Sequence, residues 1–249
     1  MNKLLKEKET AQGHKVPARL LSSGFTNAKT KKNKYKTFIL YLAPHKQNSK
    51  RKNLCPFASE GCASACLYTA GRGKFSNVQN ARINKTEYFL NDKIGFLKQL
   101  YKEIFREYMK AVQGDYKIAI RLNGTSDIDF YKLLKNNVCG DMWHFNGRVL
   151  FYDYTKDIKR ALYYMYDPLY YVTFSRSENN FEDCQTALFS GVNVAMVFGG
   201  ELPEFYKGFK VVDGDSRDDL MISKSGVILG LRAKGDAKKD LSGFVINKY

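Results

Sequence analysis

Three cysteines in the first third of the chain have the spacing of a metal-binding loop. Cys55, Cys62 and Cys66 fall within twelve residues, as C-x6-C-x3-C, and they are three of the five cysteines among 249 residues. Several thiolates from one loop are typical ligands of a cubane iron–sulfur cluster or of zinc. Three of them predict either a [4Fe–4S] cluster with one open iron or a zinc site completed from elsewhere.

The source of a fourth ligand separates these two centres. His45 lies ten residues before Cys55 and could complete a Cys3His zinc site, and Cys139 and Cys184 are the other candidates. Cys184 falls in a helical pattern and Cys139 stands beside Gly140, and both positions also suit a buried small apolar residue. We therefore expect the open iron–sulfur cluster, with zinc as the alternative.

The bulk properties of the chain predict a cytoplasmic protein. No run of eighteen apolar residues occurs, and residues 1–19 are rich in lysine without the apolar centre of a signal peptide. We expect no contact with a membrane. In a reducing cytoplasm, clustered cysteines are more often metal ligands or catalytic groups than disulfides.

The positive charge is concentrated near the N-terminus. The whole chain carries +16, and residues 1–52 hold fourteen Lys and Arg against only Glu7 and Glu9, a net charge of +12. A segment of this kind can contact nucleic acid or another anionic partner, although a solvated tail has the same composition. We predict possible nucleic-acid contact through residues 1–52.

Seven short apolar runs predict the strands that must position the cysteine loop. They are continuously apolar rather than alternating, and most are followed by helix-like sequence, which indicates a parallel sheet covered on both faces. The runs are 35–42, 116–122, 148–152, 170–174, 192–198, 209–212 and 227–231. Helices are predicted from about 76 to 89 and 91 to 113, and over 129–135, 157–166 and 181–190.

These elements predict an α/β fold. We expect a single domain over 36–249, a parallel β/α barrel or partial barrel resembling a TIM barrel, preceded by a basic arm over 1–35. A doubly wound open sheet is the alternative, and the lack of a nucleotide fingerprint after the first strand disfavours it. In a barrel, the cysteine loop 55–66 would face the same mouth as the other strand ends.

Polar residues follow almost every predicted strand. Carboxylates and a lysine could act as catalytic acid–base groups, while amides, hydroxyls, glycines and further charges could bind a small or nucleotide-like substrate or a cofactor. Each residue alone also suits a helix cap or a turn, but their recurrence favours a shared site. The predicted catalytic residues are Asp127, Asp153, Lys156 and Glu178. The predicted binding residues are Arg121, Asn123, Ser126, Ser175, Ser177, Gly199, Gly200, Asp213 and Asp215.

Several specific strings occur along most of the chain. In order, they are Leu54-Cys55-Pro56, Cys62, Cys66-Leu67, Gly71-Arg72-Gly73, Arg121-Leu122-Asn123-Gly124-Thr125-Ser126-Asp127, Phe151-Tyr152-Asp153-Tyr154-Thr155-Lys156, Thr173-Phe174-Ser175-Arg176-Ser177-Glu178-Asn179 and Asp213-Gly214-Asp215. Because strings of this kind occur there in the same order, the chain resembles the bacteriophage gene product 88 family. The resemblance implies a phage origin, expression in the cytoplasm of the host bacterium and an early or accessory role.

A strand followed at once by a three-cysteine loop also resembles, more distantly, the radical S-adenosylmethionine superfamily. There, three cysteines hold a [4Fe–4S] cluster whose open iron binds the amino and carboxyl groups of S-adenosylmethionine. The resemblance implies that cluster and that co-substrate here. The cysteine spacing departs from the superfamily's usual C-x3-C-x2-C. The superfamily's Gly-Gly-Glu turn normally follows the second strand, whereas Gly199-Gly200-Glu201 in this chain lies more than 130 residues past the cysteines.

Overall fold

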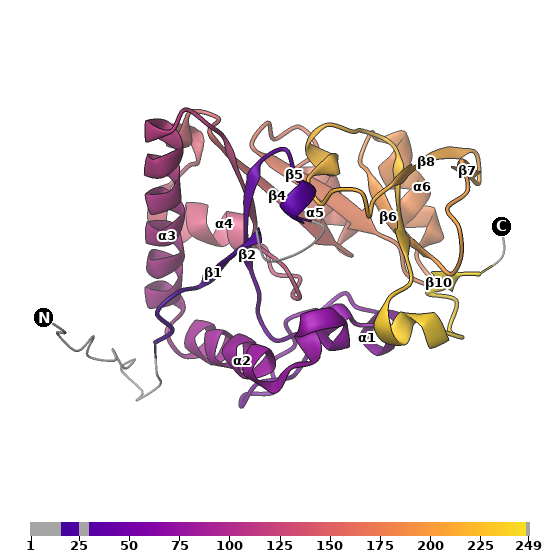
Figure 1. Ribbon diagram of the computed structural model, residues 1–249, viewed down its shortest axis with the longest axis horizontal. Helices are drawn as coiled ribbons and strands as arrows, with labels where there is room; N and C mark the ends of the chain where they lie inside the picture. The colour runs from indigo at the N-terminus through magenta and orange to yellow at the C-terminus, as the bar shows by residue number, and fades with distance from the viewer. Residues whose placement is uncertain (1–15, 25–29, 248–249) are drawn as a thin grey trace, which may run out of the picture.

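The computed structural model describes residues 16–24 and 30–247, and these residues form a ten-stranded sheet with helices around it (Figure 1). The strand order is β1-β2-β3-β4-β5-β6-β9-β8-β7, and β10 pairs with β6. All neighbours from β2 to β8 are parallel, and β1 and β7 are antiparallel to their partners. The strands are β1 Leu21–Ser23, β2 Lys36–Leu40, β3 Ile118–Arg121, β4 Val149–Thr155, β5 Tyr170–Ser175, β6 Val194–Phe198, β7 Phe205–Tyr206, β8 Phe209–Asp213, β9 Ile228–Arg232 and β10 Val245–Ile246.

The predicted helices are present, and one further helix lies inside the cysteine loop. The helices are α1 Glu60–Ser64, α2 Ser76–Asn91, α3 Lys93–Gln113, α4 Phe130–Leu134, α5 Ile158–Tyr163 and α6 Phe181–Phe189. The longest, α3, begins where the Asp92 side chain accepts a hydrogen bond from the Gly95 backbone, and it ends at Gly114. Because α1 is only five residues long, hydrophobic periodicity could not reveal it.

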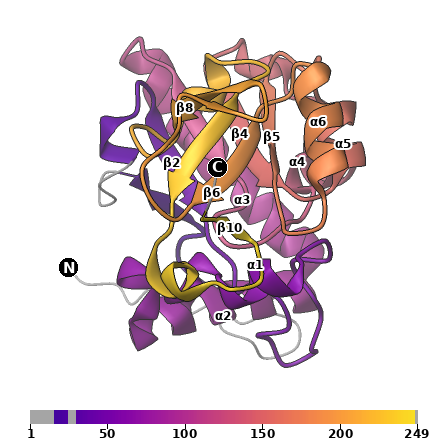
Figure 2. The same ribbon diagram turned by 90° about the vertical axis from the view of Figure 1, so that its right-hand side faces the viewer.

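The two faces of the sheet are covered differently. Ile118 and Ile120 of β3 belong to the largest hydrophobic core, which α3 and α4 complete on one face. Ala119 points to the other face, where it packs in a cluster with Tyr152 and with residues of the short helical turn Leu220–Ile222. Helices α5 and α6 lie side by side over a second core that includes β5 and β6 (Figure 2).

The sheet is open, so the predicted closed barrel is not confirmed. From β2 to β6 the parallel strands follow one another across the sheet without a reversal, which is also the order of a barrel. Beyond β6, however, β9 precedes β8, and β7 turns back antiparallel at the far edge. At the near edge, β1 pairs with β2 and occupies the edge that a closing strand would need.

Part of the predicted N-terminal arm lies against the domain. Leu20 and Leu21 are buried, and their backbone N–H groups donate to the Glu103 carboxylate on α3 at 2.8 and 2.9 Å. Residues 1–15 and 25–29 of the arm are outside the described residues. None of the helices in the described part of the chain has the length and apolar character that a membrane span requires.

A buried ion pair joins the sheet to the segment that covers its second face. The Arg121 guanidinium contacts the Asp218 carboxylate at 3.1 Å, and the Tyr152 hydroxyl donates to the same carboxylate at 2.7 Å. Burial alone would lower the pKa of Arg121, but the charge of Asp218 outweighs it and raises the pKa. Arg121, which was predicted to bind a ligand, joins the sheet to this segment through Asp218.

Replacing Asp218 should therefore cost much of the stability of the fold. We expect Asp218→Ala to lower the free energy of unfolding by about 3–5 kcal/mol, because it leaves a buried guanidinium without its counter-ion. Lys110→Ala is the control. It removes one exposed partner of Glu107, which keeps Arg19 and Arg106 nearby, so it should lower the free energy of unfolding by less than about 1 kcal/mol. Urea denaturation measures both, and equal small losses would contradict this role of Asp218.

Candidate metal centre

The cysteine loop lies over the carboxyl ends of the parallel strands. The loop follows β2 in the chain, and the segment after β3 contacts it. The Asp127 backbone N–H donates to the Leu54 carbonyl at 2.8 Å, and the Cys55 thiol lies 3.7 Å from the Thr125 carbonyl. Both views place α1, α2 and the C-terminal helical turn Gly235–Lys239 at this same end of the molecule (Figures 1 and 2).

A carboxylate from the segment after β5 fixes helix α1. Glu178 accepts hydrogen bonds from the Ser59 hydroxyl at 2.7 Å and from the Gly61 backbone at 2.9 Å, while the Ser59 oxygen accepts from the Cys62 backbone. Burial alone raises the pKa of Glu178, but these hydrogen bonds outweigh it and lower the pKa. Glu178 was predicted as an acid–base group, and its contacts make it a positioning residue for the loop.

The three thiols share one partly buried site. Burial, with a smaller contribution from the nearby Cys66, Asp127 and Cys62, raises the pKa of Cys55 to about 12. Burial also raises the pKa values of Cys62 and Cys66. The residues described here include no group of three or more His, Cys, Asp and Glu that could hold a metal ion in this arrangement.

Lys156 borders this site on the Cys62 side. Its charge and a hydrogen bond oppose the effect of burial on the pKa of Cys62. The Lys156 ammonium donates to the Ser175 hydroxyl at 3.0 Å and to the Arg176 carbonyl at 3.1 Å, and it lies 5.3 Å from the centre of the Phe244 ring. Lys156 and Ser175, both predicted site residues, are therefore brought together beside the cysteines.

Arg82 borders the site on the Cys66 side, and the sequence did not reveal it as a site residue. Its side chain on α2 is only 9% exposed, and its Nε and Nη1 find no hydrogen-bond acceptor among the described residues. The guanidinium carbon lies 4.9 and 5.4 Å from the centres of the Tyr41 and Tyr68 rings, and its charge lowers the pKa of Cys66. An arginine on the apolar stripe of a predicted helix was the available signal.

The predicted residues after β3 and β4 form a polar network beneath the loop. Asp153 is fully buried and accepts hydrogen bonds from the Asn123 backbone, the Asn123 amide and the Tyr170 hydroxyl at 2.7 to 3.0 Å. Asp127 forms an ion pair with buried Arg160 and accepts from the Lys156 backbone, while Ser126 donates to Asn123. Asp153 thus faces the helix layer with Tyr170 and not the thiols, because it shares the face of β4 that carries Phe151.

The remaining predicted residues lie at strand ends but are engaged elsewhere. Asp213 and Asp215 form ion pairs with Arg232 and Lys234. The Ser177 backbone and hydroxyl donate to the side chains of Asn180 and Asn179. Gly199 lies against the C-terminal segment, where a Cβ would approach the Asn247 side chain to 2.1 Å, and the position of Gly200 is open.

The candidate fourth ligands lie in different surroundings. Cys184 is part of α6 and is buried in the core under that helix, and the Cys139 thiol lies 3.5 Å from the Leu134 carbonyl at the edge of another core. Of these three candidates, only His45 is close to the loop. Its backbone donates a hydrogen bond to Cys55, and this bond partly opposes the effect of burial on the pKa of that thiol. The C-terminal segment covers the loop instead, through a cluster that joins Cys62 and Ala65 to Ala237 and Phe244.

A family model described as Gene product 88 matches residues 19–248, which is most of the chain. The chain belongs to the gene product 88 family. This membership confirms the resemblance to that bacteriophage family, while the more distant resemblance to the radical S-adenosylmethionine superfamily gains no support. The chain has no significant match among curated proteins or among solved structures.

The buried carboxyl of Asp153 predicts a pH-dependent stability. Burial raises its pKa from 3.8 to about 6. Below about pH 4 the carboxyl group is protonated in both the folded and the unfolded state. As the pH rises to about 6, the unfolded state loses this proton first, so the stabilisation of the folded state is lost. The advantage of the wild type over Asp153→Asn in free energy of unfolding should therefore shrink by about 3 kcal/mol between pH 4 and pH 7.

Urea denaturation at several pH values measures this difference. Asp240→Asn is the control, because hydrogen bonds from Ser242 and Val245 outweigh burial and lower the pKa of Asp240. Its contribution should instead change below about pH 4. A wild-type advantage over Asp153→Asn that stays constant from pH 4 to pH 7 would contradict the raised pKa.

Proposed function

We propose that this chain is a phage-encoded iron–sulfur enzyme whose [4Fe–4S] cluster is held by Cys55, Cys62 and Cys66. The substrate would be small or nucleotide-like, bound at the carboxyl ends of the strands, and the sheet would act as a partial barrel. The observation that carries the proposal is the pair of cations beside the cysteine loop, with Lys156 near Cys62 and Arg82 near Cys66.

The charges around the site favour an anionic centre. Three thiolates on an iron–sulfur core, or on zinc, leave a net negative charge. A buried guanidinium without an acceptor is costly, and a negative charge beside Cys66 would compensate Arg82. Burial raises the pKa values of Cys55 and Cys62, so these thiols hold their protons. A bound metal would displace the protons and stabilise the thiolates.

The surroundings of the thiols favour an open cluster over a closed zinc site. Cys139 and Cys184 lie in separate cores, so the protein offers three thiols at this position. A [4Fe–4S] cluster held by three thiolates leaves one iron available as a Lewis acid or as an electron donor. Glu178 and Ser59 would keep the loop in place, and the C-terminal segment around Phe244 would limit the access of water.

S-adenosylmethionine remains part of the proposal as the co-substrate, and a radical mechanism as its leading version. The alternative is a zinc-stapled protein without catalytic activity that binds nucleic acid or a host factor through its basic N-terminal segment. His45 would then supply the fourth ligand, since its backbone already contacts Cys55. The identity of the metal separates these two functions.

Metal analysis of the protein purified without oxygen tests the proposal. We expect iron and sulfide, with visible thiolate-to-iron absorbance, in the wild type and a loss of most of the iron in Cys55→Ala, Cys62→Ala and Cys66→Ala. Cys139→Ala and Cys184→Ala are matched controls that should keep the iron. A colourless protein that contains only zinc after growth in iron-replete medium would refute the cluster, and a changed electron paramagnetic resonance spectrum on adding S-adenosylmethionine would support that co-substrate.

The charge of Arg82 should matter for retaining the metal. We expect Arg82→Gln to lose metal to a chelator roughly tenfold faster than the wild type, because the anionic centre loses a buried counter-ion. Arg82→Lys keeps the charge and should recover part of the difference. Arg106→Gln, at a half-exposed arginine on α3, is the control. Equal rates for all four proteins would contradict the proposed role of Arg82.

A further inference from the structure

Among the described residues, lysines and tyrosines line a groove at the opposite end of the sheet. Lys34, Tyr35 and Lys36, at the start of β2, and Tyr116 and Lys117, just before β3, enclose a volume of about 480 Å³. This size is within the range of small-ligand sites. Because these residues precede the parallel strands, the groove lies at the amino ends, whereas the cysteine loop lies at the carboxyl ends.

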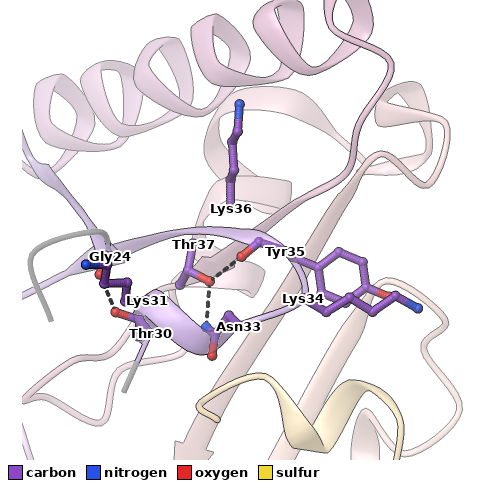
Figure 3. Close-up of a pocket in the computed structure, with 8 residues that line it drawn as sticks. All are labelled: Gly24, Thr30, Lys31, Asn33, Lys34, Tyr35, Lys36 and Thr37. Carbon is purple, nitrogen blue, oxygen red and sulfur yellow. Dashed lines mark hydrogen bonds between the residues drawn. The ribbon is translucent and has the colours of Figure 1, made fainter. Parts of the chain in front are cut away.

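A smaller pocket, whose lining residues are drawn in Figure 3, shares part of its lining with this groove. Its volume is about 100 Å³, and it shares Lys34, Tyr35 and Lys36 with the groove and adds Lys31. Four lysines therefore line these two adjoining pockets. The part of the chain that the structure describes shows no ion pair to any of them.

Hydrogen bonds between neutral groups hold the wall of this surface in place, and the carboxylate behind the wall faces inward. The Asn33 amide donates to the Thr37 hydroxyl at 2.7 Å, and that hydroxyl donates to the Tyr35 carbonyl at 3.0 Å (Figure 3). A carboxylate behind this wall, Asp219, is 1% exposed and accepts hydrogen bonds from the backbones of Lys34 and Tyr35, and Asp115, which precedes Tyr116, forms an ion pair with Arg148. The charge of Asp219 is directed inward, where Arg217 also contacts it, so the lysine ammonium groups remain available to an anion.

Each tyrosine ring has a cation beside its face. The Lys36 ammonium lies 3.6 Å from the centre of the Tyr116 ring, and the Lys34 ammonium lies 5.7 Å from that of Tyr35. Both rings are partly exposed. Aromatic faces interleaved with cations suit a strand whose bases stack on the rings while its phosphates contact the lysines. The bases of a duplex are already stacked and paired, so their faces are not free.

We propose that this Lys-Tyr groove binds single-stranded nucleic acid. The inference goes beyond the iron–sulfur function and requires no metal. It also differs from a general attraction to the basic segment 1–52, because Tyr116 and Lys117 lie outside that segment and complete the groove from β3.

Fluorescence anisotropy of a labelled oligothymidylate with the full-length chain tests the groove. The triple variant Lys34→Gln/Lys36→Gln/Lys117→Gln should bind at least tenfold more weakly, and its slope of log K against log salt should be shallower by about 2. The control is Lys93→Gln/Lys98→Gln/Lys102→Gln on α3, which removes the same charge from exposed lysines and should change affinity by less than about threefold. An equal loss in both triple variants would overturn the proposal.

Substitutions of Tyr116 test the contribution of base stacking separately from that of the lysine charges. Tyr116→Ala should weaken binding roughly fivefold or more, whereas Tyr116→Phe keeps the ring and should bind like the wild type. Equal denaturation midpoints for these two variants would show that the loss does not come from unfolding. Equally tight binding of a duplex, or competition by thymidine monophosphate at the oligomer's own affinity, would overturn the assignment to a single strand.

Discussion

The candidate centre depends on the contact between the Glu178 carboxylate and the first turn of α1. The cysteine loop contributes no strand to the sheet, and α1 is too short to be stable alone. Glu178 satisfies the Gly61 backbone and the Ser59 hydroxyl, and the Ser59 oxygen in turn satisfies the Cys62 backbone. One carboxylate thereby connects the segment after β5 to the cysteine loop, which follows β2, and fixes where Cys62 lies.

Beneath that contact, buried charges are arranged so that nearly all are paired. Asp127 with Arg160, Asp153 with Asn123 and Tyr170, and Arg121 with Asp218 form a polar layer within an otherwise apolar domain. Arg82 departs from this pattern, because two of its nitrogens are buried without an acceptor among the described residues. Since an uncompensated buried charge is expensive, the position of Arg82 beside Cys66 is the observation behind the proposed anionic occupant at the thiols.

Strands β2 and β3 connect the two proposed sites. Both strands begin at the Lys-Tyr groove, and they lead at their other ends to the cysteine loop and to the segment that contacts it. The five residues of β2 span roughly 16 Å, and the two surfaces lie at opposite ends of that strand. A nucleic-acid strand at one end and a metal centre at the other would be separated by the thickness of the domain.

The sequence alone determined the seven parallel strands, the five main helices and the place of the cysteine loop after the first of those strands. These depend on local patterns: continuous apolar runs, helical stripes and capping residues. Tertiary structure decided the rest. Sheet closure depends on which distant edges pair, and β1 occupies the edge of β2. The face of β4 to which Asp153 points depends on register, and the positions of Arg82 and Phe244 beside the thiols depend on how α2 and the C-terminal segment pack. No local pattern encodes these contacts, because each joins residues far apart in the chain.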